Sequence, residues 1–193
     1  SNLDQQGIIR NNSTYNRTTA RLNVTSKLSD MVTATSNMSY SRISSDRIQR
    51  GSNTSGLYLG FLRTPADFDQ RDYKGTYYNA SGVPFFNRQR SYRRQIGNAA
   101  SPTYDNPLWV INEFTNTSDV DRAIGSFQVD VTPTDWLTLI ARVGVDDYTD
   151  RLVTYFPINS AANSGRGSYS DQAIGETQTN ADFMARITST ITD

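Results

Sequence analysis

Two pairs of aspartates are the nearest approach in this sequence to a catalytic site. Asp146 and Asp147 are adjacent, and Asp119 and Asp121 are separated by one residue. Glycoside hydrolysis needs two carboxyl groups held at a set separation across a cleft. The residues around Asp146 alternate as a β-strand does, and adjacent strand residues point to opposite faces of a sheet. Asp146 and Asp147 therefore cannot share one site, and the sequence favours charged positions on a hydrated sheet over catalysis.

Histidine and cysteine are both absent from the 193 residues. Their absence excludes Ser-His-Asp and Cys-His nucleophiles, disulfides and cysteine-based zinc sites. The segment DFDQRD at 67–72 is rich in oxygen atoms but lacks the glycine and the terminal glutamate of a calcium-binding hand. We therefore predict no metal, no cofactor and no enzymatic activity. A surface enzyme would need an acid pair that the sequence does not offer.

Aromatic side chains gather in a long polar segment between residues 44 and 118. Together with arginine and asparagine they could stack against a sugar or a peptide and hydrogen-bond it. The alternative, which we favour, is that the segment packs on itself or against another subunit. The basic run RQRSYRRQ at 88–95 is likewise expected to be paired with acidic residues from elsewhere. The aromatic residues are Tyr58, Phe61, Tyr77, Tyr78, Phe85, Phe86, Tyr92, Tyr104 and Trp109, and the candidate ligand-binding residues among them are Tyr58, Phe61, Tyr77, Tyr78 and Trp109.

The composition narrows the class of protein further. The formal net charge is zero, so electrostatics gives no case for binding nucleic acid or anionic lipid. Hydrophobic residues make up 36% of the chain, and no apolar run approaches the length of about 18 residues that predicts a transmembrane helix. The start of the chain lacks a signal-peptide pattern. We therefore expect a mature form or an internal piece of a longer protein.

Long stretches of the sequence alternate with a period of two residues, which predicts β-strands with two different faces. Tight turns are expected near Ser29 and Asp30 and at TPTD, where Pro133 presets the backbone. A short helix is predicted within 53–62. Long loops are expected at about 44–118 and 153–175. The predicted strands are about 14–28, 31–43, 120–131, 136–152 and 177–191.

The two faces of these strands predict a membrane β-barrel. One parity is only moderately apolar, while the other carries arginine and aspartate in the middle of the strands, as between lipid and a wet lumen. Short turns at one end and long loops at the other fit the same layout. Aromatics near strand ends would suit interfacial girdles, and they are Tyr40, Trp136, Tyr148, Tyr155 and Phe156. A soluble β-sandwich or adhesin module is the alternative fold.

The number of predicted strands is too small for a closed barrel, because membrane barrels have at least about eight strands. Open strand edges in lipid would leave backbone groups without partners, at several kcal/mol each. Either the loops contain further strands, or several chains assemble one barrel, or the chain is part of a longer one. The last of these is the expectation.

Several motifs resemble those of a known family, the SusC/RagA-type TonB-dependent transporters of Bacteroidota. The segment from Asp4 to Ser41 resembles the early barrel strands of that family, and SGLYLGFLRTPADFD at 55–69 resembles the helical segment that follows. DNPLW at 105–109 and DWLTLIARVGVDDYTD at 135–150 resemble further family motifs. The resemblance extends over essentially the whole sequence.

The resemblance implies an all-β fold in which residues 1–193 form part of one 22-stranded outer-membrane β-barrel with long extracellular loops. It implies TonB-dependent uptake of oligosaccharide or peptide nutrients, with a SusD-like surface lipoprotein and TonB as partners. The implied location is the bacterial outer membrane, with lipid around the barrel. The plug and the TonB box of the family have no counterpart in these residues, so the carry-over concerns the barrel wall and its outer loops. A secreted or surface β-rich binding module is the alternative function.

Overall fold

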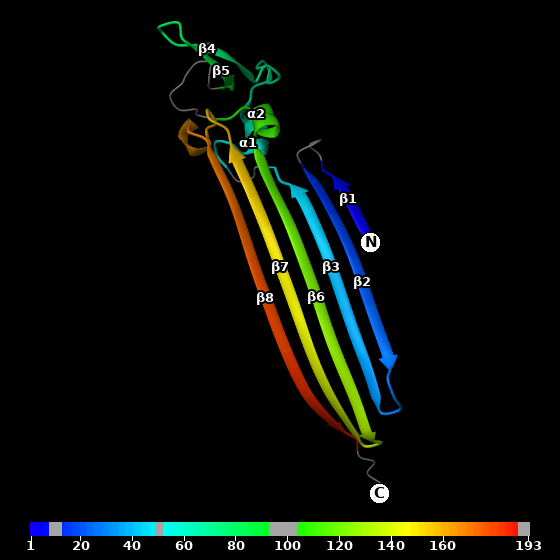
Figure 1. Ribbon diagram of the computed structural model, residues 1–193. Coiled ribbons are helices and arrows are strands. Elements are labelled where there is room, and N and C mark those ends of the chain that lie inside the picture. The colour runs from blue at the N-terminus through cyan, green and yellow to red at the C-terminus, as the bar shows by residue number, and fades with distance from the viewer. Residues whose placement is uncertain (8–12, 49–51, 93–103, 189–193) are drawn as a thin grey trace.

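A long antiparallel sheet forms the body of the protein in the computed structural model, which describes residues 1–7, 13–48, 52–92 and 104–188. The six strands lie in the order β1-β2-β3-β6-β7-β8, so neighbours in the sheet are mostly neighbours in the chain (Figure 1). Each strand pairs with the next in an antiparallel sense. The strands are β1 (Asn2–Gln6), β2 (Thr14–Lys27), β3 (Val32–Asp46), β6 (Thr115–Thr134), β7 (Leu137–Phe156) and β8 (Ser168–Ile187).

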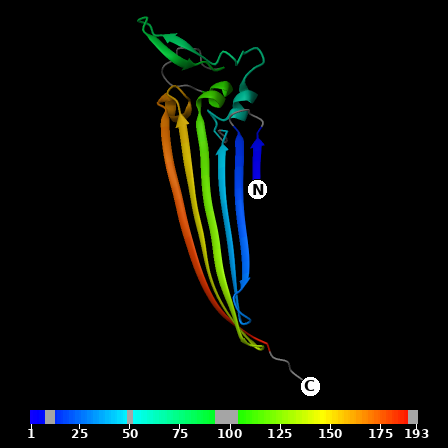
Figure 2. The ribbon, with the colours of Figure 1, turned by 45° about the vertical axis from the view of Figure 1, so that its right-hand side comes forward.

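The remaining elements gather at one end of the sheet and form what we call the head (Figures 1 and 2). The head comprises described residues 52–92, 104–114 and 157–167. Its hairpin of β4 and β5 extends away from the long sheet (Figure 2). At the opposite end of the sheet, the described residues form tight turns and the end of β8. The head elements are α1 (Leu57–Arg63), β4 (Lys74–Tyr78), β5 (Pro84–Gln89), α2 (Pro107–Glu113) and the short helix η1 (Ala162–Gly165).

The two tight turns have local causes. At the first, the Ser29 hydroxyl accepts a hydrogen bond from the Met31 backbone N–H, and the Leu28 N–H donates to the Val32 carbonyl. The second turn lies at 135–136, and a register shift between Val131 and Thr134 precedes it. Pro133 lies within this irregularity, where a residue without a backbone N–H is tolerated.

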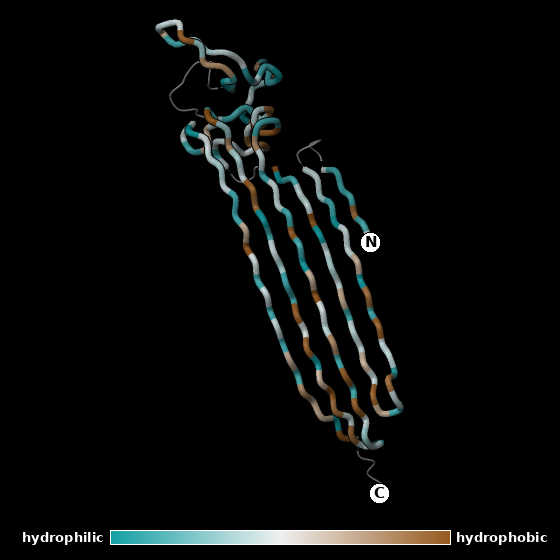
Figure 3. Tube along the Cα trace, viewed as in Figure 1, coloured by the Kyte–Doolittle hydropathy of each residue, from teal (hydrophilic) through white to brown (hydrophobic). Residues whose placement is uncertain are grey.

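The register keeps side chains of one parity together across the sheet. Leu22 faces Met38, Met38 faces Gly125, and Gly125 faces Val145. We call the face that these residues share the belt face and the opposite one the charged face. The belt face carries an apolar belt towards the turn end, where brown residues are dense in Figure 3. Its members are Ala20, Leu22, Val24, Val32, Ala34, Met38, Tyr40, Ala123, Phe127, Val129, Val131, Leu137, Leu139, Ala141, Val143, Val145, Ala181, Phe183, Ala185 and Ile187.

The belt ends abruptly along the sheet. On the same face, the next positions towards the head are Arg42 facing Asp121, and Asp119 facing Arg151. The belt face is therefore apolar near the turns and polar near the head. No described helix is long and apolar enough to cross a membrane.

Five strands were predicted from alternation, and the structure has a strand at each of these places. Their bounds differ at the head end, where β6 begins at Thr115 and β8 at Ser168. The predicted loops are consequently shorter, and the first contains two helices and the β4–β5 hairpin. The strand β1 was not predicted, because NLDQQ lacks an alternating apolar pattern. The predicted helix within 53–62 corresponds to α1, and the second turn lies at 135–136, after Pro133.

The aromatics predicted for interfacial girdles lie in different surroundings. Tyr40 lies at the head-side limit of the apolar belt, and Trp136 lies exposed in the second turn. Tyr148 lies on the charged face, opposite Arg122. Phe156 packs into the head, which the alternating pattern could not reveal. The girdle prediction is therefore wrong for Tyr148 and Phe156.

Candidate functional site

The head is built around one buried tryptophan. Trp109 on α2 is 2% exposed and packs with Val110 and Phe114. Its indole N–H donates a hydrogen bond of 2.9 Å to the Oγ of Ser160, which is fully buried. The ring of Phe156, at the end of β7, lies 4.8 Å from that of Phe114. This core therefore fastens the head to the end of the long sheet.

The N-terminus of α2 is capped by its own sequence. The side-chain oxygen of Asn106 accepts a hydrogen bond of 2.8 Å from the Leu108 N–H, and Pro107 occupies the first turn. These are favoured residues at the two positions. Glu113 ends the helix and Thr115 begins β6, so the direction of α2 is tied to the long sheet.

A buried polar cluster lies next to this core. Gln89, which is fully buried, donates to the carboxylate of Asp105 and, over 2.6 Å, to the Asn159 carbonyl. The Ala161 N–H donates to the same carboxylate oxygen of Asp105 over 2.6 Å. Gln89 also accepts from the Asn106 N–H over 3.1 Å. The cluster joins the β4–β5 hairpin, α2 and the segment after β7, so it fixes the shape of the head.

Burial raises the pKa of Asp105, because a charged carboxylate is disfavoured away from water. The hydrogen bonds from Gln89 and from the Ala161 N–H oppose this effect. The other carboxylate oxygen, Oδ2, is buried without a hydrogen-bond partner among the described residues. Ionisation of Asp105 is therefore incompletely compensated.

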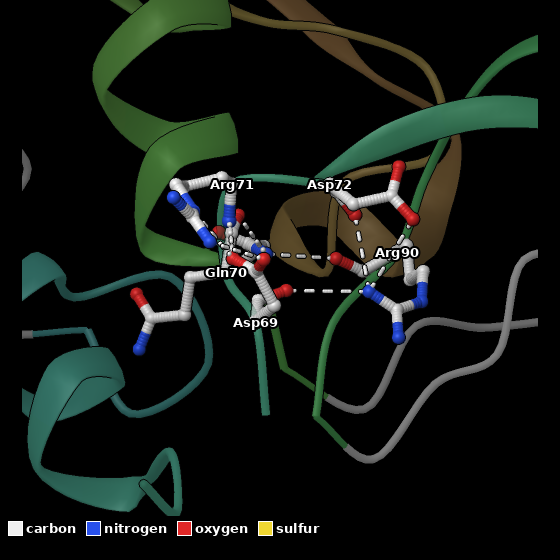
Figure 4. A network of polar contacts seen from close by, with 6 residues as sticks. Asp69, Gln70, Arg71, Asp72 and Arg90 are labelled. Atoms are coloured by element: carbon white, nitrogen blue, oxygen red, sulfur yellow. Dashed lines mark hydrogen bonds and ion pairs between the residues drawn. The ribbon is translucent and has the colours of Figure 1, made fainter. Parts of the chain in front are cut away.

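The DFDQRD segment forms an ion-pair network, shown in Figure 4. Arg71 donates to the carboxylate of Asp69 from its backbone N–H and its guanidinium, at 2.9–3.0 Å. These bonds lower the pKa of Asp69 to about 2. Arg90 forms an ion pair with Asp72 at 3.6 Å and donates to the Asp69 carbonyl at 3.2 Å. Arginines therefore pair with two carboxylates of this segment, those of Asp69 and Asp72, and the described residues contain no cluster suited to a metal.

The candidate ligand-binding residues have different surroundings. Tyr58 is 78% exposed on α1, and Phe61 on the same helix is also exposed. Tyr78 is 63% exposed on the β4–β5 hairpin, whereas Tyr77 stacks on Phe85 with ring centroids 6.0 Å apart. These four therefore lie on α1 and on β4.

Trp109 has no such access, because it forms the centre of the head core. Its predicted role in ligand contact does not agree with its burial. The alternative interpretation, in which the long segment packs on itself, describes this residue. Spacing in the sequence cannot distinguish the two cases, since both use a large aromatic residue beside polar ones.

A small cavity of about 120 Å³ lies between α1 and the segments at 91–92 and 104–105. Arg63 lies over the ring of Tyr104, 4.5 Å from its centroid, and donates 2.6 Å to the Asn53 side chain. The lining of the cavity combines hydroxyl, guanidinium and carboxylate groups, which suits a small polar group of a ligand. The lining residues are Asn53, Thr54, Gly60, Arg63, Thr64, Ser91, Tyr92, Tyr104 and Asp105.

The predicted basic run at 88–95 is paired where the structure describes it. Arg88 lies 5.2 Å from the ring centroid of Phe85, and Arg90 lies 4.6 Å from that of Phe68 while pairing with Asp72. Residues 93–95 lie outside the described residues. The expectation that acidic residues pair with the run holds for Arg90.

The charged face of the sheet carries cross-strand ion pairs. Arg122 binds Asp146 through two hydrogen bonds of 2.9 and 2.5 Å, and Arg142 lies 2.8 Å from Asp182. The prediction that Asp146 and Asp147 point to opposite faces is confirmed, because Asp147 accepts a hydrogen bond from Thr177 on the belt face. Such pairs make this face of the sheet a polar wall.

Comparisons with solved structures identify the fold. The RagAB peptide importer in its closed-closed state matches with a TM-score of 0.67 and 19% identity, over 100% of this chain and 20% of that one. The open-open state gives a TM-score of 0.65 and 18% identity, over 95% and 19% of the two chains. A further RagAB peptide transporter structure gives 0.63 and 17%, again over 95% and 19%. Neither a family model nor a curated protein matches the sequence.

This chain spans about one fifth of the length of the RagAB chains that it matches. Identities below 20% establish a likeness of fold, and the matched proteins are barrel transporters. The resemblance to SusC/RagA-type transporters that the sequence predicts is therefore confirmed at the level of the fold. The chain has the fold of a barrel segment, open at β1 and β8 among the described residues, with long connections at one end of the sheet.

Proposed function

We propose that this chain supplies part of the barrel wall and the outer loops of a nutrient transporter in the bacterial outer membrane. The observation that carries the proposal is the apolar belt across one face of a sheet with a transporter-barrel fold. In β7 the belt covers residues 137–145, and a tilted strand needs about 9–11 residues to cross a bilayer. The charged face would then line the lumen.

The head is proposed to capture the ligand at the cell surface. Tyr58 and Phe61 on α1 and Tyr78 and Phe86 on the hairpin are exposed aromatics, which stack readily on sugar rings and peptide side chains. We propose a peptide or an oligosaccharide as ligand. The same surface would contact a SusD-like surface lipoprotein, and uptake would depend on TonB acting on a plug outside this chain.

Detection of the native protein tests the location. An antibody against residues 52–92 is applied to outer-membrane fractions before and after extraction with detergent. A detergent-dependent species of about 100 kDa or more is expected, since the chain matches one fifth of a larger chain. A water-soluble species of 21.6 kDa would overturn the proposal and favour the secreted binding module.

Uptake tests the function. Cells lacking the full-length protein are grown on peptides or on oligosaccharides as the sole nutrient, with and without an intact TonB system. We expect loss of growth on one of these nutrients and the same loss without TonB. The double variant Tyr78→Ser and Phe86→Ser should reduce uptake, while Tyr169→Ser, on the wall, should not. Normal growth of the deletion strain on both nutrients would contradict the proposal.

A further inference from the structure

A groove on the belt face lies at the head-side limit of the apolar belt. It has a volume of about 500 Å³ and a mainly apolar lining. Small residues on neighbouring strands form its floor, namely Ala20, Ala123 and Gly125. Leu22, Met38 and Val145 form its sides, and all three are exposed. The groove is therefore a shallow apolar channel bounded by larger side chains.

Packing within the sheet does not require the small residue at the centre of the groove. A Cβ atom added to Gly125 would lie 3.5 Å from Cγ1 of Val145, which is an ordinary contact. Glycine is unfavourable in a strand interior, where it often marks a close approach by another group. The absence of a side chain at position 125 therefore keeps the groove open on the belt face.

Charged groups stand at the head-side end of the groove. Tyr40 and Asp147 belong to its lining, and the Tyr40 hydroxyl donates to the carboxylate of Asp121. Asp147 accepts a hydrogen bond of 2.6 Å from Thr177. Arg42 is opposite Asp121 in the register, on the same face. The groove is therefore apolar over most of its length, and its head-side end lies beside two carboxylates and one guanidinium.

These charges retain capacity for a ligand. Asp121, Asp147 and Arg42 are not in any ion pair with another described residue, unlike Arg151 and Asp171 further towards the head. Each ionised carboxylate accepts about four hydrogen bonds, and the structure gives each of these one from a side chain. A ligand with a primary ammonium and a nearby anion would complement all three.

We propose that the groove binds a phospholipid with a primary-amine headgroup. One acyl chain lies over Gly125 between Met38 and Val145. The ammonium donates hydrogen bonds to Asp121 and Asp147, and the phosphate faces Arg42. Opposite residues in a sheet have Cβ atoms about 4.5–5.5 Å apart, so the carboxylate and the guanidinium can reach adjacent groups of one headgroup. This inference rests on the proposed membrane location of the belt face.

Native mass spectrometry of the full-length transporter tests this proposal. The detergent-solubilised protein is incubated with equal amounts of phosphatidylethanolamine, phosphatidylcholine and phosphatidylglycerol. Phosphatidylcholine has the same net charge but no N–H donor, and phosphatidylglycerol has no ammonium. We expect phosphatidylethanolamine to be retained about fivefold over either, equivalent to ~1 kcal/mol. Equal retention of the three lipids would overturn the proposal.

Variants locate the site. Gly125→Leu fills the groove and should reduce bound phosphatidylethanolamine to the level of phosphatidylcholine. Ala141→Leu, on the same face but outside the groove, is the matched control and should leave the selectivity unchanged. The double variant Asp121→Asn and Asp147→Asn should abolish the preference while lipid still binds. Unchanged selectivity in Gly125→Leu would refute the site.

The two proposals fail in different ways. If the native protein is soluble without detergent, the membrane location fails and the lipid site fails with it. If the protein requires detergent and supports uptake but binds the three lipids equally, only the lipid site fails.

Discussion

Replacing Trp109 by alanine should open the head while leaving the long sheet intact. The side chain is 2% exposed and contacts Val110 and Phe114 in the head core. Truncating a buried tryptophan to alanine costs about 3–5 kcal/mol. The change also removes the indole N–H that donates a hydrogen bond to Ser160. Leaving this fully buried hydroxyl without its donor costs about 1–3 kcal/mol. The two terms overlap, so we expect a total near 4 kcal/mol.

Limited proteolysis of intact outer membranes measures this opening. When opening and closing are fast, the cleavage rate follows the free energy of local opening. A loss of about 4 kcal/mol corresponds to roughly a thousandfold increase in the rate. Trypsin cleavage after Arg63 or Lys74 reports on the head, and the electrophoretic mobility of unheated protein reports on the folded barrel.

Tyr58→Ala is the matched control, because this aromatic residue is exposed on α1 and contributes little to the core. Its cleavage rate should remain within a few-fold of the wild-type rate. If Trp109→Ala is cleaved no faster than Tyr58→Ala, the head does not depend on the tryptophan. That result would favour the prediction from the sequence that Trp109 contacts a ligand.

Three further predictions concern charges. Because the folded pKa of Asp105 is raised, its contribution to head stability is full below the ordinary pKa of about 3.9 and is lost as pH rises through the folded value. Hydrogen exchange of the head should therefore be faster at pH 7 than at pH 4 after correction for intrinsic rates. The variant Asp105→Asn should remove this difference. Asp69 behaves in the opposite sense, since Arg71 lowers its pKa to about 2. Its contribution to head stability is present above about pH 3.9 and is lost as pH falls through about 2. Hydrogen exchange of the head should therefore accelerate over that range in the wild type but not in Asp69→Asn. Arg122→Gln should lower barrel stability only slightly, because its ion pair with Asp146 is exposed to solvent. Arg122→Asp should destabilise the barrel more, because it places two carboxylates opposite each other. Exchanging the two residues should restore the thermal midpoint of the mobility shift, whereas no rescue would disprove their pairing.

The alternation of the sequence was sufficient to locate the five long strands. In β6 and β7, apolar and polar residues alternate because one face of the sheet carries the apolar belt and the other carries the ion pairs. The alternation therefore also restricts the register in which the two strands can pair. The ends towards the head were less predictable, because Phe156 leaves the sheet pattern to join the head core. The strand β1 has no parity signal, and its position follows from backbone pairing with β2.

The head was far less predictable than the sheet. Its shape depends on contacts between distant segments, such as Gln89 with Asp105 and with the Asn159 carbonyl. A local pattern contains no information about such pairs, since glutamine and aspartate are ordinary loop residues. The aromatic residues were correctly recognised as a group, but their burial was not, because the same residue types serve a core and an exposed surface.

The change of polarity on the belt face determines how far the wall would project from the membrane. Above the belt, residues 146–156 of β7 extend about 36 Å along the strand, or about 25–30 Å along the axis of a barrel with ordinary tilt. Arg151 and Asp171 form an ion pair of 2.6 Å on the belt face in this part. Lipid would penalise both charges strongly, whereas water solvates them. In the proposed membrane location the head would therefore be held well beyond the bilayer, where α1 and the β4–β5 hairpin would be free to meet ligands or a surface partner.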